Sequence, residues 1–161
     1  MWYEAIAQFE LYRILKNRIV ETFEYKRIHF VDIIPEYIIK KESKNERADL
    51  VLYLKSGTNK KPFAVIEVKM GKVNKNPASK DSAVAQAKRY AKALNSPYYI
   101  VTDGEKITCF RSRDDELIAF KSQITNRTRP GTRVKKRVPN ISLEKWTGIL
   151  EELVRDYQDG K

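Results

Sequence analysis

The first periodic segment of the chain predicts a helix. Between Trp2 and about Val20 apolar residues recur at helical spacing, and neither proline nor glycine interrupts the segment. The apolar stripe consists of Ala7, Leu11, Leu15 and Ile19. Glu4 lies on this stripe, whereas Glu10 lies well round the helix and can pair with Arg13 in solvent. The two glutamates are therefore expected to have different environments.

Short apolar and β-branched runs predict the first strands. His29–Ile34 and Glu36–Ile39 are extended runs separated by Pro35, which cannot donate to a ladder and so predicts a bend or a sheet edge. Leu50–Leu54 and Phe63–Val68 form two central strands, and the polar residues 55–62 between them suit a hairpin connection.

Two further helices and a second hairpin are predicted downstream. One helix runs from about Ser82 to Leu94, opened by Asp81 or Ser82 as cap, and a terminal helix is capped by Ser142 and runs to about Tyr157. Between these helices, runs 98–102 and 106–110 flank the dipeptide Asp103-Gly104, which predicts a two-residue turn. The order of elements favours an α/β fold with a central mixed β-sheet flanked by helices.

Composition limits the kind of protein this is. The chain has 161 residues, of which 42% are hydrophobic, enough for one domain with a core. No run approaches the length of a spanning helix, and the amino terminus lacks a signal-peptide pattern, so no membrane partner and a cytoplasmic location are expected. One cysteine, Cys109, and one histidine, His29, nearly exclude zinc chemistry.

Charge points to a polyanionic partner. The net charge is +11, and residues 121–138 are basic without a single acid, as expected of a basic arm or loop. We predict one domain over 1–161, with a core over about 1–120, a basic arm over about 121–138 and a C-terminal helix over about 142–157. Nucleic acid is the first partner to consider, and a solvating basic surface is the alternative.

The chemistry concentrates at the end of the second central strand. Side chains at i and i+2 of a strand point the same way, so Glu67 and Lys69 share one face. The residues before Glu67 are apolar, which predicts a carboxylate at the margin of a core. Asp49 starts the preceding strand, and hairpin pairing can bring it close to Glu67. A surface ion pair between Glu67 and Lys69, with Asp49 only capping a strand, remains the alternative.

Two neighbouring carboxylates favour a cation between them. Hard oxygen ligands suit Mg²⁺, for which Mn²⁺ can substitute, bound together with a phosphate. Such an ion lowers the pKa of bound water and offsets charge on a pentavalent phosphorane, while Lys69 orients or helps deprotonate the attacking water. The pattern predicts cleavage of a phosphodiester.

Four ordered motifs carry a family resemblance. They are Glu46-Arg47-Ala48-Asp49-Leu50-Val51-Leu52-Tyr53, Ala64-Val65-Ile66-Glu67-Val68-Lys69, Gln86-Ala87-Lys88-Arg89-Tyr90 and Tyr98-Tyr99-Ile100-Val101-Thr102-Asp103-Gly104. Together they resemble the PD-(D/E)XK nuclease superfamily, and within it the amino-terminal endonuclease domain of type I restriction enzyme motor subunits. The resemblance is close over residues 46–111 and loose over residues 1–20. It implies a restriction-endonuclease-like core.

The resemblance also implies roles for single residues. Asp49 and Glu67 would bind the metal, Val68 would lend a backbone carbonyl, and Lys69 would be the catalytic lysine. Gln86 and Tyr90 match the Q-x-x-x-Y element, in which the glutamine lies near the catalytic centre. Because an i, i+4 pair projects from one helical face, Gln86 can offer its amide to a substrate phosphate or to the lysine, while Tyr90 supports the helix by packing.

The family also places a glutamate of its first helix near the metal. We expect Glu4 rather than Glu10 in this role, although acids near helix starts are also stabilised by the helix dipole. Ala48 replaces the proline that precedes the aspartate in the superfamily name. No G-x-x-x-x-G-K-[ST] segment occurs, so we expect a nuclease module without the motor of such an enzyme.

Basic residues beside the motifs are candidates for DNA phosphate contacts. The candidates near the metal are Lys72, Lys75, Lys80, Lys88, Arg89 and Lys92, and those of the basic arm are Arg133, Lys135, Lys136 and Arg137. The sequence thus predicts a Mg²⁺-dependent DNA endonuclease domain, acting alone, as a homodimer or with a motor or specificity partner. Two alternatives stay open: a catalytically inactive nucleic-acid-binding or regulatory module of the same fold, and a dimeric junction-resolving nuclease.

Overall fold

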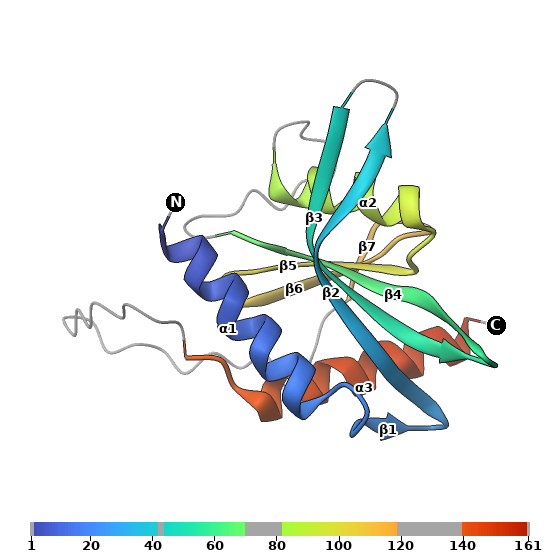
Figure 1. Cartoon of the computed structure of the whole chain (residues 1–161). Helices are drawn as coiled ribbons and strands as arrows, with labels where there is room; N and C mark the ends of the chain where they lie inside the picture. Colours follow the sequence, from blue (N-terminus) through green and yellow to red (C-terminus); the bar gives the residue numbers. More distant parts are fainter. Residues whose placement is uncertain (1, 42–43, 70–81, 119–139, 161) are drawn as a thin grey trace.

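A seven-stranded sheet forms the centre of the computed structural model, which describes residues 2–41, 44–69, 82–118 and 140–160. The elements in chain order are α1 (Trp2–Arg18), β1 (Glu24–Tyr25), β2 (Ile28–Lys41), β3 (Lys44–Ser56), β4 (Asn59–Val68), α2 (Ala83–Leu94), β5 (Tyr98–Thr102), β6 (Ile107–Arg111), β7 (Glu116–Ile118) and α3 (Leu143–Asp159). The strands lie in chain order across the sheet, and β4 and β5 form its parallel pair. Figure 1 shows α2 on one side of the sheet and α1 and α3 on the other, which confirms the predicted α/β fold.

Helix α2 follows from the parallel pair, because parallel neighbours need a crossover that returns the chain to the same end of the sheet. The cap is Ser82, whose Oγ accepts a hydrogen bond from the Ala85 N–H at 3.0 Å. The other predicted cap, Asp81, lies outside the described residues. The helix ends at Asn95, which adopts the left-handed conformation typical of a helix end.

Alternation along β4 divides the interior into two cores. Ala64, Ile66 and Val68 belong to the core that α1 and α3 cover, as the period of two predicts. Val65 faces the smaller core beneath α2, together with Tyr90. Glu67 therefore projects toward the α2 side, at the end of the strand where the smaller core meets the surface.

The predicted helices are confirmed at nearly their predicted bounds. All four residues of the α1 stripe are at most 2% exposed. The cap of α3 is Ser142, and its Oγ accepts from the Lys145 N–H at 3.2 Å. Five side chains of α3 enter the same core as the α1 stripe, and they are Trp146, Ile149, Leu150, Leu153 and Val154.

Of the two predictions for Pro35, a bend or a sheet edge, the structure shows the edge. β2 is one continuous strand through this position, and Pro35 pairs with Leu50 of β3. The other neighbour of β2 is β1, which pairs only with Ile28 and His29. Among the described residues, the rest of that side of β2 carries no strand, and a free edge tolerates a residue without an N–H.

Both predicted turns differ in length from the observed ones. The connector 55–62 is mostly strand, and the turn is the dipeptide Gly57-Thr58, with Gly57 at a φ of 63°. The second hairpin has a four-residue loop rather than the two-residue Asp103-Gly104 turn, because Thr102 pairs with Ile107. The Asp103 side chain closes this loop by accepting hydrogen bonds from the N–H groups of residues 105 and 106 at 2.9 and 2.7 Å.

The short outer strands β1 and β7 were not predicted, because two or three residues show no measurable alternation. The basic arm over 121–138 lies outside the described residues. Among the described helices, none is both long and apolar enough to span a membrane.

Candidate metal centre

Asp49 and Glu67 meet where β3 and β4 separate. The antiparallel register places Leu50 opposite Ile66, so the two acids occupy the next position along. Each carboxylate accepts a hydrogen bond from the backbone of the other strand: the Asp49 N–H donates to Glu67 Oε1 at 3.2 Å, and the Val68 N–H donates to Asp49 Oδ2 at 2.8 Å. The two acids are thus held together by their own strands.

Burial makes this a costly place for two charges. Glu67 is 4% exposed, and burial, followed by the Asp49 charge, raises the pKa of its carboxyl well above the ordinary value. Burial also raises the pKa of Asp49, and the Val68 N–H offsets part of that shift. A cation between the two carboxyl groups would balance their charges and favour the ionised form of both.

The donor set fits a hard divalent cation. It offers two carboxylates at the end of a strand, the class of ligand that Mg²⁺ prefers. Within the described ranges, no three acidic, histidine or cysteine side chains gather as a complete protein-only site. Mg²⁺ is commonly bound through one or two carboxylates, with substrate phosphate and water completing its shell.

Lys69 and Glu4 flank the pair of acids. The Lys69 N–H donates to the Thr102 carbonyl at 2.8 Å and so extends the parallel pairing of β4 and β5 by one residue. The Lys69 side chain is 52% exposed, and its Nζ lies 3.5 Å from Glu4 Oε1. The amino-terminal end of α1 lies near this end of β4 in Figure 1. The structure therefore brings four of the predicted residues to one place: Glu4, Asp49, Glu67 and Lys69.

Glu10 lies away from this group, because its carboxylate pairs with Arg13 at 2.8 Å on the outer surface of α1. Of the two helix glutamates, Glu4 is the one beside the lysine. Whether it contacts a metal stays a prediction. The Val68 backbone is engaged through its N–H, and the role predicted for its carbonyl also stays a prediction.

The two side chains of the Q-x-x-x-Y element, Gln86 and Tyr90, form a hydrogen bond with each other. Gln86 Nε2 donates to the Tyr90 hydroxyl at 2.9 Å, across one turn of α2. Tyr90 is 2% exposed and packs in the smaller core, where burial, followed by the Glu67 charge, raises the pKa of its hydroxyl. One N–H of the Gln86 amide is therefore engaged within its own helix, and the predicted contact with phosphate or lysine stays a prediction.

The predicted phosphate-binding residues are only partly described. Lys88 Nζ forms an ion pair with Asp115 at 2.7 Å, and Arg89 is half-buried on α2. Lys92 is exposed. The remaining candidates lie outside the described residues, and they are Lys72, Lys75, Lys80, Arg133, Lys135, Lys136 and Arg137.

Two residues at the site escaped sequence reasoning. Gln8 Nε2 donates to the Asp49 carbonyl at 3.2 Å, although its position one turn after Glu4 could have suggested it. Glu36 of β2 adopts a left-handed φ of 49°, and its charge contributes to the raised pKa of Asp49. No sequence pattern indicates that a glutamate at this position leaves the strand conformation.

The mixed sheet, its crossover helix and its flanking helices define an α/β domain with a restriction-endonuclease-like core. Residues 13–124 match the family model described as type I restriction enzyme R protein N terminus, and the chain belongs to that family. The match spans Asp49, Glu67 and Lys69 and confirms the resemblance to the amino-terminal domain of type I restriction enzyme R proteins; it gives the chain a restriction-enzyme-related role. Comparison with curated proteins and with solved structures gave no significant match.

Proposed function

We propose that this chain is a Mg²⁺-dependent DNA endonuclease domain of the PD-(D/E)XK type. The observation that carries the proposal is the pairing of Asp49 and Glu67, each of which accepts a hydrogen bond from the backbone of the other's strand. Lys69 follows two residues after Glu67. A buried pair of acids without a cation is destabilising, and a fold keeps such a pair where function needs it. The family of R protein N termini agrees with this reading.

Asp49 and Glu67 would hold the cation, with the Val68 carbonyl as a further ligand and Glu4 in or near its shell. When bound, Mg²⁺ would supply a water of lowered pKa and would offset the charge that develops on the phosphate. Mn²⁺ would substitute, because it accepts the same oxygen ligands.

The protein's own groups position the reactants. The exposed Lys69 ammonium, held toward Glu4, donates hydrogen bonds to the attacking water or to a phosphate oxygen. Buried Glu67 is fixed by the Asp49 N–H, so its oxygen does not reorganise during the reaction. Gln86 would contact the substrate through the part of its amide that Tyr90 does not engage.

DNA is the proposed substrate, and the net charge of +11 favours its backbone. A motor or specificity subunit is the proposed partner, in keeping with the R protein family, and a homodimer is the other arrangement. The proposed location is the cytoplasm.

Cleavage assays on linear, nicked, single-stranded and four-way DNA test this function. We expect cutting with Mg²⁺ or Mn²⁺ and none after chelation. Lys69→Met is expected to slow cutting by about a hundredfold, the typical cost of losing one donor to developing charge. Lys106→Met, which alters an exposed lysine in the β5–β6 loop, serves as the control and should cut normally.

Three results would change the proposal. Cutting that persists under chelation, or in the Lys69→Met and Asp49→Asn variants alike, would reject this site. DNA binding without cutting, under any divalent cation, would favour the inactive binding module. Selective cutting of four-way DNA by a dimer would favour a junction-resolving nuclease.

A further inference from the structure

The backbone of Asp49 stands outside the regular ladder of the sheet. Pairing of β3 with β4 begins at Leu50 and Ile66, one residue after Asp49. On the β4 side, Asp49 is therefore the first residue of β3 beyond the paired region. A half-buried residue at such a point needs other partners for its N–H and its carbonyl.

The ladder is also interrupted on the β2 side. Pro35 and Tyr37 pair with the two neighbours of Asp49, yet no pairing joins Asp49 to Glu36, which lies between them. The left-handed φ of Glu36, 49°, departs from strand geometry and accounts for the interruption. Asp49, whose carboxylate is proposed to bind the metal, is therefore not paired with β2.

Side chains take the place of the missing ladder. The Asp49 N–H donates to Glu67 Oε1, and the Asp49 carbonyl accepts from Gln8 Nε2, both at 3.2 Å. The first contact belongs to the pair of acids already described. The second comes from α1, a separate element on the other side of the sheet from α2.

Helix α1 therefore contacts the site at two successive turns. Glu4 lies 3.5 Å from Lys69, and Gln8 bonds to the backbone of Asp49. Residues four apart lie on one helical face, so both contacts depend on the same position of α1. The buried stripe that begins at Ala7 fixes this face against the main core.

We infer that Gln8 is a positioning residue, which holds the backbone of Asp49 and thereby sets its carboxylate for metal binding. This inference rests on the proposed function. Gln8 does not touch the cation; it acts through Asp49. Groups that orient a metal ligand in this way typically change metal affinity by about 10- to 100-fold when removed.

Manganese titration by calorimetry on the metal-free full chain tests the inference. Gln8→Met keeps the length of the side chain and removes its N–H donors, and we expect the Kd for Mn²⁺ to rise about tenfold. Gln8→Ala is the second variant, since alanine favours α1 and should give the same rise. Phe9→Ala, at a neighbouring position that is 62% exposed, is the matched control and should bind as the unaltered chain does.

Circular dichroism at the titration temperature establishes that each variant is folded, so a lower stability alone does not imitate the result. Unchanged Mn²⁺ affinity in both Gln8 variants would overturn the inference and leave the nuclease proposal standing. An unaltered chain that neither binds Mn²⁺ nor cuts DNA would reject the proposed function and this inference with it.

Discussion

Glu67→Gln is expected to slow metal-dependent DNA cleavage by about a thousandfold or more and, at the same time, to raise the Tm of the metal-free chain. The loss follows from removing one of two carboxylates that would hold the cation, an effect of roughly 4 kcal/mol on the transition state. The gain follows from burial, because Glu67 is 4% exposed beside a second acid. A neutral amide of the same size carries no charge to desolvate.

The pH dependence of the Tm gain in Glu67→Gln follows from the direction in which the fold shifts the pKa of Glu67. The folded chain raises the pKa of Glu67 well above its ordinary value of 4.5, so the folded state binds this proton more tightly than the unfolded state. Stability from this group is present at low pH and is lost as pH rises from the ordinary value through the raised one. The Tm advantage of Glu67→Gln should therefore be small near pH 5 and should grow toward pH 8.

The cleavage assay measures the loss of activity, and thermal melts with and without Mg²⁺ measure the gain in Tm and the loss of metal binding. A change of about 1 kcal/mol shifts Tm by roughly 2–4 °C in a chain of this size, so the gain is measurable. Mg²⁺ should raise the Tm of the unaltered chain and leave that of Glu67→Gln unchanged. Glu24→Gln, which alters an exposed acid on β1, is the control. A variant that melts lower than the unaltered chain and still cuts would contradict the prediction.

The meeting of Asp49 and Glu67 was predictable because it depends only on strand alternation and hairpin pairing. Alternation places Glu67 and Lys69 on one face, and a hairpin brings the start of one strand to the end of the next. The observed register brings Asp49 opposite Glu67, although the turn between the strands differs in length from the predicted one. The meeting of the two acids could therefore be predicted without the correct length of the turn.

The parts that sequence reasoning missed depend on contacts between distant residues. Gln8 and Asp49 are 41 positions apart, and no local pattern links them. Pro35 predicted either a bend or a sheet edge, and only the pairing of distant strands decides that it is an edge. Gln86 and Tyr90 matched a motif, but the motif does not give the rotamer, and the amide bonds to Tyr90.

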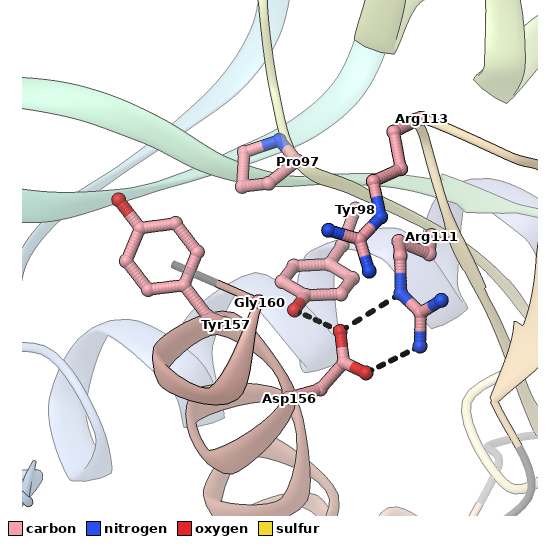
Figure 2. Close-up of a pocket in the computed structure, with 7 residues that line it drawn as sticks. All are labelled: Pro97, Tyr98, Arg111, Arg113, Asp156, Tyr157 and Gly160. Carbon is pink, nitrogen blue, oxygen red and sulfur yellow. Dashed lines mark hydrogen bonds and ion pairs between the residues drawn. The ribbon is translucent and has the colours of Figure 1, made fainter.

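A second cluster of charges lies away from the proposed metal centre and joins α3 to the sheet. Asp156 of α3 accepts hydrogen bonds from the Tyr98 hydroxyl of β5 and from Arg111 of β6, with Arg111 Nε at 3.1 Å and Nη2 at 2.5 Å. Figure 2 shows this carboxylate between the two side chains, in a pocket that Tyr157 also lines. One carboxylate therefore ties the last helix to two strands.

Asp156→Ala is expected to destabilise the fold by about 2–3 kcal/mol. Breaking a fully buried pair costs about 3–5 kcal/mol, and the partial exposure of these side chains, 18% for Arg111 and 21% for Asp156, reduces that figure. The variant also leaves the Tyr98 hydroxyl without its acceptor. Tm should fall by roughly 4–12 °C, whereas Asp159→Ala, at an exposed position near the end of the same helix, should leave it nearly unchanged or slightly higher.

The same carboxylate gives the fold an acid limit. Burial alone would raise its pKa, but the hydrogen bonds from Arg111 and Tyr98 lower the pKa of Asp156 below the ordinary 3.8. The stabilisation by ionised Asp156 is therefore complete at pH values above the ordinary pKa of 3.8, and it is lost as pH falls through the lowered pKa of the folded chain. Urea titrations between pH 2.5 and 6 should show the stability of the unaltered chain falling more steeply on the acid side than that of Asp156→Ala. Parallel pH profiles for the two chains would contradict the stabilising role of the ionised Asp156 carboxylate.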